Sequence, residues 1–338
     1  MKSVLVSVGF LIKIDELYIN SIGIMEPLVD FSFVLPIYNE EETLPEVFRR
    51  IRGVMDDLPM ECEAVFVDDG SIDASRVMLR RAVSEDPRIR VVLLSRNHGH
   101  QLAVTAGMHH AKGQKAVFVL DGDLQDPPEL ASDFLQTMEE GFDVVYGVRK
   151  KRKEGLVLRM AYFLAYRLIG WLSDIQLPLD AGDFALMSRR VVDRMNAMPE
   201  RNRYLRGMRA WVGYPQTGYE YERSARFAGE SKYSFRMLLD LMYQGVFSFS
   251  EVPIRLMRVV GLGSIGLCGL YSIYLLGKYF LLGTIPEGFT SIILFLFFFF
   301  GIQTFFLGIL GEYVARTLAE GRGRPVFLVQ EVIESVPA

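Results

Sequence analysis

Two long apolar stretches near the C-terminus constrain the fold of this chain more than any other feature of its sequence. Residues 259–282 contain one charged residue, Lys278, and residues 289–311 contain none. A helix needs about 20 apolar residues to cross a lipid bilayer, and both stretches have that length. The alternative is a buried core helix, but core helices are usually shorter and interrupted. We therefore expect two transmembrane helices.

The segments around these stretches predict how the chain is oriented in the membrane. The polar segment 283–288 is short, which favours a tight turn and an antiparallel hairpin. Arginines flank the outer ends of the hairpin, whereas the turn carries only Glu287. The positive-inside rule then predicts that the large N-terminal part and the tail 312–338 lie on the cytoplasmic side of the cell membrane. Residues 233–257 fit an amphipathic helix, either along the membrane interface or packed on the soluble domain.

The amino-acid composition limits the classes of protein to which this chain can belong. A chain of 338 residues that is 50% hydrophobic is long enough for about two domains and too apolar to be disordered. Its formal net charge of −4 excludes a global basic field, so we expect no nucleic-acid partner. Cys62 and Cys268 lack metal-ligand or disulfide spacing, which favours a reducing compartment. The leader 1–30 has no cleavage site and is not interpreted as a signal peptide, and Met25 is an alternative start.

The first half of the chain has the pattern of an α/β domain. Short β-rich runs alternate with amphipathic segments, and the expected strands are 31–36, 64–68, 89–94, 116–121 and 143–147. This alternation predicts a Rossmann-like parallel sheet, whose ligands bind at the carboxyl ends of the strands. The chain has neither the glycine motif of dinucleotide-binding folds after its first strand nor a P-loop, so neither redox nor P-loop chemistry is expected.

Acidic residues follow three of these expected strands. The fourth run is followed by Asp121, Asp123 and Gln125, which are spaced two apart. If the strand conformation continues, their side chains point to one face. Carboxylate and amide oxygens in this arrangement suit Mg²⁺ or Mn²⁺. A metal ion there would offset the repulsion between this acidic edge and a diphosphate.

Several ordered motifs resemble the inverting family-two glycosyltransferases of GT-A fold. The motifs are Pro36-Ile37-Tyr38-Asn39-Glu40, Asp68-Asp69-Gly70-Ser71, Arg96-Asn97-His98-Gly99, Asp121-Gly122-Asp123-Leu124-Gln125-Asp126-Pro127-Pro128-Glu129 and Ala181-Gly182-Asp183-Phe184. Within that family the chain is similar to the polyisoprenyl-phosphate glycosyltransferases, which include dolichyl-phosphate mannose synthase and the bacterial bactoprenol glucosyltransferases. The resemblance runs from about Phe31 to the C-terminus. It implies a GT-A catalytic domain over residues 31–232, followed by the transmembrane hairpin.

The resemblance also implies a donor site. The residues that fall where the family holds the uridine or guanosine part of the donor are Pro36, Tyr38, Glu40, Asp68 and Asn97. Asp121 and Asp123 fall on the family's metal-binding D-x-D motif, with Gln125 as an added contact to the metal or the diphosphate. In a later polar block, Arg226 and Lys232 are candidates for diphosphate contacts that help the leaving group depart.

Asp183 matches the position at which inverting GT-A enzymes keep a carboxylate near the acceptor, and we expect it to be catalytic. A phosphate monoester has a second pKa of about 6, so such an acceptor is already largely ionised at neutral pH. Three roles therefore stay open for Asp183: accepting a residual proton, orienting the donor sugar, or ordering its loop. For the acceptor phosphate, the family resemblance favours Arg149 and Arg159. The basic residues 150–153 are expected to face anionic lipid headgroups.

These inferences predict an inverting, metal-dependent transfer of a hexose from a nucleotide sugar to a polyprenyl phosphate. By resemblance we favour UDP-glucose and undecaprenyl phosphate, and mannose or another donor sugar stays open. A processive polysaccharide synthase fits less well, because only two spans are expected. An inactive membrane-anchored scaffold that binds nucleotide sugars is the alternative from another class. Residues 322–329 predict a short strand that pairs with another subunit, hence a homo-oligomer. The four histidines fit no zinc spacing and are interpreted as surface or packing residues.

Overall fold

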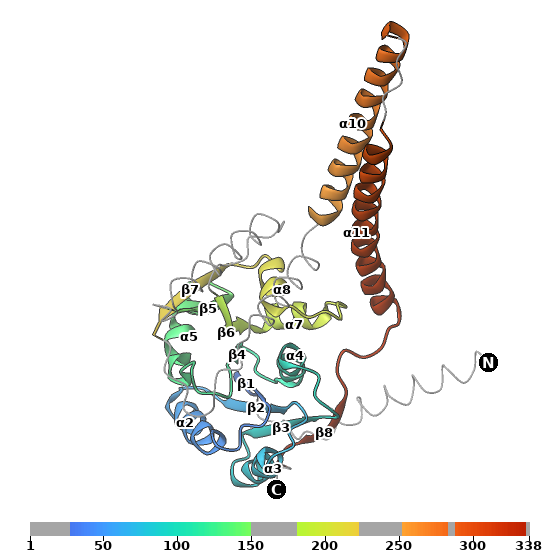
Figure 1. Ribbon diagram of the computed structural model, residues 1–338. Helices are drawn as coiled ribbons and strands as arrows, with labels where there is room; N and C mark the ends of the chain where they lie inside the picture. Colours follow the sequence, from blue (N-terminus) through green and yellow to red (C-terminus); the bar gives the residue numbers. More distant parts are fainter. Residues whose placement is uncertain (1–27, 150–180, 223–251, 283–287, 336–338) are drawn as a thin grey trace, which may run out of the picture.

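The computed structural model describes residues 28–149, 181–222, 252–282 and 288–335. Within these ranges the chain forms an α/β domain from which two long helices project (Figure 1). Three of the predicted site residues, Arg159, Arg226 and Lys232, lie outside the described residues. So do the basic residues 150–153 and all of the predicted juxtamembrane segment up to residue 251.

A mixed eight-stranded sheet forms the centre of the domain, in the order β7-β5-β6-β4-β1-β2-β3-β8. The strands are β1 (Phe31–Ile37), β2 (Cys62–Asp68), β3 (Ile89–Leu94), β4 (Ala116–Val119), β5 (Val144–Arg149), β6 (Ala181–Ser188), β7 (Gln216–Tyr221) and β8 (Val329–Ile333). The expected parallel sheet is confirmed for β1 to β4. β5 does not pair with β4, because β6 lies between them and is antiparallel to both.

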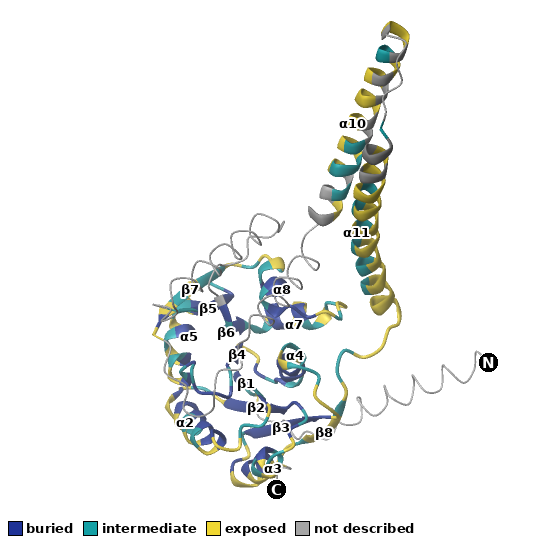
Figure 2. Cartoon of the chain, in the orientation of Figure 1, coloured by how far each residue is buried: buried dark blue, intermediate teal, exposed yellow. Residues whose placement is uncertain are grey.

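Helices cover both faces of this sheet. They are α2 (Leu44–Asp57), α3 (Ser75–Glu85), α4 (His100–His110), the 3₁₀ turn η1 (Pro128–Leu130), α5 (Ala131–Glu139), α7 (Arg189–Ala197) and α8 (Leu205–Trp211). Along β1, Phe33 and Leu35 pack with α2, α3 and α5, whereas Val34 packs with α4, α7 and α8. This is the alternation of a strand that is buried on both sides. Figure 2 shows the buried residues concentrated in these layers.

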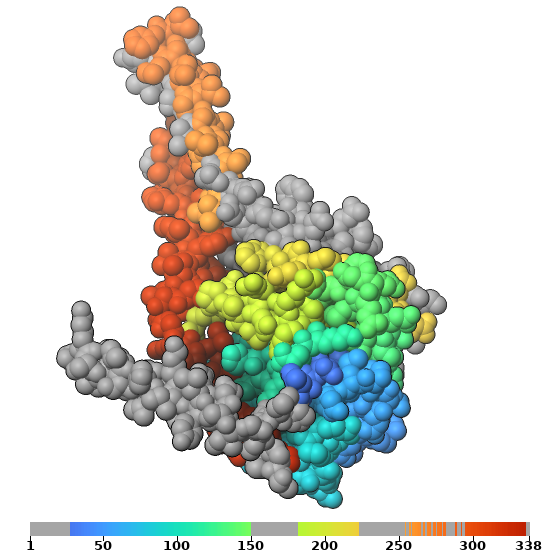
Figure 3. Space-filling view, turned by 180° about the vertical axis from the view of Figure 1, so that it is seen from behind, coloured from blue at the N-terminus to red at the C-terminus, as the bar shows by residue number. Residues whose placement is uncertain are grey.

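The two predicted apolar helices are α10 (Val252–Leu282) and α11 (Phe289–Gly321). Each contains a candidate membrane span, Val259–Lys278 and Phe295–Gly321, with mean hydropathy of 1.8 and 1.7. Neither span is buried against the rest of the protein, and Figure 3 shows the pair projecting from the domain. Exposed apolar surface of this extent indicates association with a membrane.

The chain returns to the sheet after α11. β8 pairs antiparallel with β3 of the same chain, with Val92 opposite Val332. The prediction of a strand at 322–329 that pairs with another subunit was therefore wrong in both position and partner. Gly323 adopts a left-handed conformation with φ of 60°, and Pro325 has no backbone N–H for a strand ladder. Both residues interrupt an extended strand, so β8 begins only after them, at Val329.

Candidate active site

The loop after β4 carries the predicted metal ligands, but not as part of a strand. β4 ends at Val119, and Leu124 has a left-handed φ of 57°. The expectation that Asp121, Asp123 and Gln125 share one face of a continued strand was therefore wrong. Instead the loop folds on itself, and the buried Oδ1 of Asp123 accepts a hydrogen bond from the Gln125 backbone N at 3.1 Å.

Gly122 packs this loop against the end of β1. A Cβ atom built on Gly122 would lie 2.5 Å from Ile37 Cδ1 and 3.2 Å from Pro36 O. A larger residue there would require the buried Ile37 side chain to move and would crowd the Pro36 carbonyl. Glycine at this position thus brings the acidic loop next to Pro36 and the other residues predicted to hold the donor.

Asp183 lies at the start of β6 and is held by side chains from two helices. Arg206 of α8 donates to both carboxylate oxygens, from Nε at 2.8 Å and from Nη2 at 3.2 Å. Gln101 of α4 donates from Nε2 to Asp183 Oδ2 at 2.9 Å. The other end of the Gln101 amide accepts a hydrogen bond from the Leu205 backbone N at 3.0 Å. One glutamine therefore joins the carboxylate to the beginning of α8.

His100 lies between Asp121, a predicted metal ligand, and Asp183, a predicted catalytic residue. Its Nε2 is 3.6 Å from Asp121 Oδ1 and 3.4 Å from Asp183 Oδ2. Burial opposes protonation, but the two carboxylates outweigh it and raise the pKa of His100 above its usual value. The imidazole is therefore charged at neutral pH. His100 is exposed, as expected for a surface residue, and it also contacts these two carboxylates.

The same contacts decide the charge of Asp183. Burial alone would raise its pKa, but Arg206 and His100 overcome that effect and hold the pKa of Asp183 well below its usual value. The side chain is a carboxylate at neutral pH and a weak proton acceptor. Its contacts suit it to holding cationic groups in place.

The acidic loop suits a divalent cation. Burial raises the pKa of Asp121 to about 6; His100 opposes this shift, and Asp126 and Asp123 add to it. A carboxylate that is costly to ionise is stabilised by a nearby cation. Within the described ranges, no three His, Cys, Asp or Glu side chains are grouped as metal ligands. Asp121 and Asp123 would hold an ion only together with other oxygens, such as those of Gln125 and a diphosphate.

Arg209 of α8 is a buried cation close to Asp183. Its side chain stacks on the Tyr146 ring, with 5.0 Å between the guanidinium carbon and the ring centre. Nη1 lies 3.4 Å from Gly182 O, whereas Nε and Nη2 have no hydrogen-bond partner among the described residues. Burial lowers the pKa of Arg209 to about 10, so it remains charged at neutral pH.

Arg149 approaches the same short segment from the end of β5. A Cβ atom built on Gly182 would lie 3.6 Å from Arg149 Nη2. The predicted acceptor arginine thus lies beside the residue that precedes Asp183. Arg149 also faces Asp126, with 3.9 Å between Nη2 and Oδ2.

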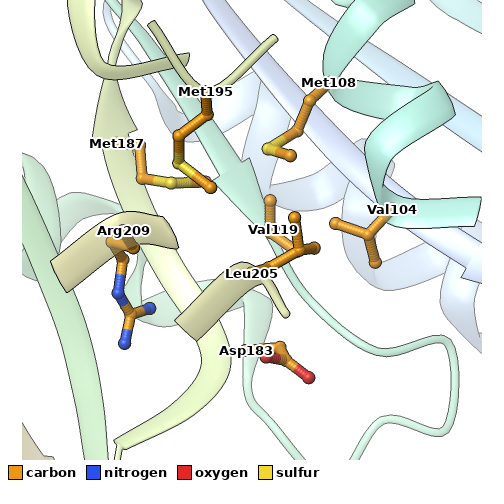
Figure 4. A pocket seen from close by; sticks show the side chains of 8 residues that line it. All are labelled: Val104, Met108, Val119, Asp183, Met187, Met195, Leu205 and Arg209. Carbon is orange, nitrogen blue, oxygen red and sulfur yellow. The ribbon is translucent and has the colours of Figure 1, made fainter. Parts of the chain in front are cut away.

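A small cavity lies behind these charged groups. It has a volume of about 10 Å³, room for about one water molecule. Its lining consists of Val104, Met108, Val119, Asp183, Met187, Met195, Leu205 and Arg209 (Figure 4). In Figure 4, the guanidinium of Arg209 and the carboxylate of Asp183 lie on one side, away from the three methionine side chains. The polar ends of Arg209 and Asp183 therefore point away from the apolar core.

The predicted donor-side residues lie at the carboxyl ends of β1, β2 and β3. Asp68 is fully buried, and its oxygens accept hydrogen bonds from Ser71 N at 3.1 Å and Arg76 Nε at 2.6 Å. Glu40 is held at both ends: its N donates to Ser75 Oγ, and its Oε2 accepts from Thr43 Oγ1. In contrast, the side chains of Tyr38 and Asn97 are exposed.

Four residues around Asp183 were missed by the sequence analysis: His100, Gln101, Arg206 and Arg209. His100 and Gln101 directly follow the Arg96–Gly99 motif at the carboxyl end of β3, and this position was the available signal. Arg206 and Arg209 had no comparable signal, because α8 reaches Asp183 only through the tertiary fold.

The chain is similar to known glycosyltransferases. A family model described as glycosyl transferase family 2 matches residues 32–195. The chain is 42% identical over 304 residues to an uncharacterized glycosyltransferase, YkcC, of Bacillus subtilis, covering 90% of this chain and 94% of that protein. It is 33% identical to a prophage bactoprenol glucosyl transferase homolog of Escherichia coli, covering 89% of this chain and 98% of that protein.

A bactoprenol glucosyl transferase of Shigella phage SfV is 34% identical, with 88% of this chain and 97% of that protein covered. Among solved structures, a mannosyltransferase of Pyrobaculum calidifontis in complex with GDP-mannose and Mn²⁺ has a TM-score of 0.47 and 20% identity, over 64% of this chain and 63% of that one. Relatives this similar in sequence over nearly the whole length show that the chain belongs to glycosyl transferase family 2 and is a glycosyltransferase of GT-A fold.

Proposed function

We propose that this glycosyltransferase transfers a hexose, with inversion, from a nucleotide sugar to a polyprenyl phosphate at the cytoplasmic face of the membrane. Glucose from UDP-glucose and undecaprenyl phosphate are the first candidates, because several relatives are named bactoprenol glucosyl transferases. The product is a polyprenyl monophosphosugar. Another donor sugar in the same reaction is the main alternative.

One observation carries this proposal: three arginines gather around Gly182 and Asp183, the part of the site that we assign to the acceptor. Arg149 and Arg209 flank Gly182, and Arg206 is held beside them by Asp183. A sugar hydroxyl would not need such a set of charges. A phosphate monoester does, because guanidinium groups match its charge and geometry.

The donor is expected to lie along the ends of β1 to β4. Its nucleoside is assigned to the turns that contain Pro36, Tyr38, Glu40, Asp68 and Asn97. The diphosphate then lies near the acidic loop, and the hexose lies between that loop and Asp183. Mg²⁺ or Mn²⁺ held by Asp121, Asp123 and Gln125 would supply positive charge that stabilises the departing diphosphate. Arg226 and Lys232 remain candidates for the same task.

The reaction is a single displacement at the anomeric carbon. An oxygen of the acceptor phosphate attacks that carbon from the face opposite the diphosphate. The bond from carbon to the β-phosphate oxygen breaks, its electron pair stays on that oxygen, and the nucleoside diphosphate leaves. Because the attacking oxygen is already ionised, no proton has to be removed.

This chemistry leaves Asp183 free for a role other than general base. Its carboxylate binds Arg206 and lies beside His100, and the pKa of Asp183 is held well below its usual value. We assign it to fixing these two cations where the acceptor phosphate meets the donor sugar. This role is distinct from the three that the sequence left open, of which accepting a proton is disfavoured by the lowered pKa of Asp183.

The test is formation of a lipid-linked sugar by the purified full-length protein in detergent. UDP-glucose, UDP-galactose and GDP-mannose are offered separately with undecaprenyl phosphate, in Mg²⁺, in Mn²⁺ or with a chelator. We expect product from one donor, lost on chelation. Asp121→Asn should lower turnover at least about a hundredfold, on the scale of other losses of transition-state charge stabilisation.

Glu129→Gln is the matched control for this variant. Glu129 lies eight residues further along, is exposed and pairs with Arg50. Its loss should leave turnover within about twofold, as for other surface ion pairs. Nucleotide binding without transfer from any donor would instead favour the inactive scaffold.

A further inference from the structure

The segment that follows α11 is held by the turn after β3 and by Arg76 of α3. Leu328 O accepts a hydrogen bond from Ser95 N at 2.9 Å, and Leu328 N donates to His98 Nε2 at 3.4 Å. Burial and Arg96 lower the pKa of His98, in keeping with a neutral imidazole that accepts this bond. Two positions further on, Gln330 Oε1 accepts from Arg76 Nη1 at 3.3 Å.

Arg76 links the C-terminal segment to the buried ends of β2 and β3. Its Nε donates to Asp68 Oδ2 at 2.6 Å, and its Nη2 donates to Leu94 O at 3.0 Å. One guanidinium therefore joins the end of β2, the end of β3 and the C-terminal strand. Only a planar group with several fixed donors can make all three bonds together.

The turn after β3, which this segment contacts, is joined closely to the turn after β2. Asp69 accepts hydrogen bonds from His98 N at 2.7 Å and from Gly99 N at 2.9 Å. Gly70 packs so closely on the second turn that an added Cβ would lie 2.6 Å from Asn97 N. These are the turns to which the proposed function assigns the donor's nucleoside. A shift of the segment Leu328–Gln330 would therefore move residues on that side of the site.

We propose that the C-terminal segment Leu328–Gln330 is part of the donor site, and that Arg76 and Gln330 are the positioning residues through which it acts. The inference rests on the proposed function for the location of the donor. It adds that the polypeptide leaving the second apolar helix sets the affinity for the nucleotide. Neither positioning residue has to touch the donor itself.

The experiment measures UDP and GDP binding and initial rates on the full-length protein in detergent. Gln330→Leu removes the acceptor of the Arg76 bond and should raise the dissociation constant for the bound nucleotide, and KM for the sugar donor, by about three- to tenfold. The KM for undecaprenyl phosphate and the midpoint of thermal unfolding should stay unchanged. Gln330→Glu keeps an acceptor for Arg76 and should restore donor affinity.

Glu331→Gln provides a matched control on the same strand. Glu331 pairs with Arg80 of α3, one turn from Arg76, and both side chains of that ion pair are exposed. Its loss should not change donor affinity. Equal weakening by Gln330→Leu and Glu331→Gln, or no weakening by Gln330→Leu, would overturn the inference. If the unmodified protein bound neither UDP nor GDP, the proposed function itself would fail.

Discussion

The charged side chains around Asp183 differ in how many of their polar atoms have hydrogen-bond partners. Both carboxylate oxygens of Asp183 accept hydrogen bonds from Arg206 or Gln101, whereas two guanidinium nitrogens of Arg209, Nε and Nη2, have no hydrogen-bond partner among the described residues. A buried, incompletely paired guanidinium lowers the stability of a fold. Its retention is explained if it binds an anion that the free protein lacks, and the acceptor phosphate is the anion that the proposed reaction requires.

Replacing Arg209 tests whether this residue serves acceptor binding or the stability of the fold. Arg209→Met keeps most of the volume and removes the charge, so it should stabilise the fold by about 1 to 3 kcal/mol. The same change should raise KM for polyprenyl phosphate at least about tenfold, because one charged contact is lost. Thermal unfolding and initial-rate kinetics on the full-length protein measure both effects. The pKa of Arg209, lowered to about 10 by burial, means that the gain in stability persists throughout the neutral range.

Arg206→Met is the comparison for this variant. Arg206 binds Asp183, so its removal leaves a buried carboxylate with fewer partners and should destabilise the protein. A fall in stability for Arg209→Met as well would show that Arg209 is structural and would remove it from the acceptor site.

At the level of single residues, the sequence predicted the carboxylates of the site but not the side chains that contact them. Asp121, Asp123 and Asp183 stand in ordered motifs that can be recognised along the chain. His100 lies in no such pattern with Asp183, because 83 residues separate the two positions and they meet only in the folded chain. The position of His100 after the Arg96–Gly99 motif could mark it as a residue near the site, but its contact with Asp183 depends on tertiary structure and cannot be predicted from local spacing.

Among the structural elements, the turns after β2 and β3 depend most on backbone conformation. Gly70 has a left-handed φ of 78°, and its Cα faces the backbone of Arg96 and Asn97. An added methyl group would need both a strained conformation and a displaced neighbouring turn. The shape of this donor-side unit is therefore sensitive to a single methyl group.

Two Gly→Ala substitutions test this sensitivity. Gly70→Ala should lower the free energy of unfolding by about 1 to 3 kcal/mol and also weaken nucleotide binding. Gly53→Ala, in the exposed interior of α2 with nothing within 4 Å of the added Cβ, should raise stability by about 0.5 to 1 kcal/mol. Chemical denaturation and UDP binding measure the two effects. Similar stability changes in both variants would contradict the role given to Gly70.

The elements themselves were predictable to different degrees. The first four strands were expected because each is a short apolar run followed by turn residues. The place of β6 between β4 and β5 was not, because no local pattern specifies which strands pair across the sheet. The C-terminal strand was displaced from its predicted position by Gly323 and Pro325, whose backbone preferences outweigh the β-rich composition of the segment around them.

The whole molecule combines a soluble domain with a pair of exposed apolar helices. The proposed topology puts residues 283–288 on the far side of the membrane and the domain in the cytoplasm. Cysteine labelling with a membrane-impermeant maleimide tests this arrangement in intact cells. Glu287→Cys should react in intact cells, whereas Ser84→Cys, at an exposed position of α3, should react only after the cells are opened.

The unmodified chain is the background for this experiment. Cys62 is buried, and burial raises the pKa of its thiol to about 11, so it reacts slowly. Labelling of Ser84→Cys but not of Glu287→Cys in intact cells would show that the chain has the opposite orientation in the membrane.

The last part of α11 extends beyond its apolar stretch. From Gly311 to Gly321 the helix continues for about 15 Å at the usual rise per residue, with Glu312, Arg316 and Glu320 four residues apart along it. At its end, Glu320 accepts a hydrogen bond from Arg201 N, in the segment that leads into α8. If the uncharged stretch 289–311 is the part that crosses the bilayer, the charged end of α11 would hold the domain away from the membrane surface. The acceptor phosphate of the proposed reaction would then have to leave the headgroup layer to reach the site, whereas most of its polyprenyl chain could remain in the bilayer.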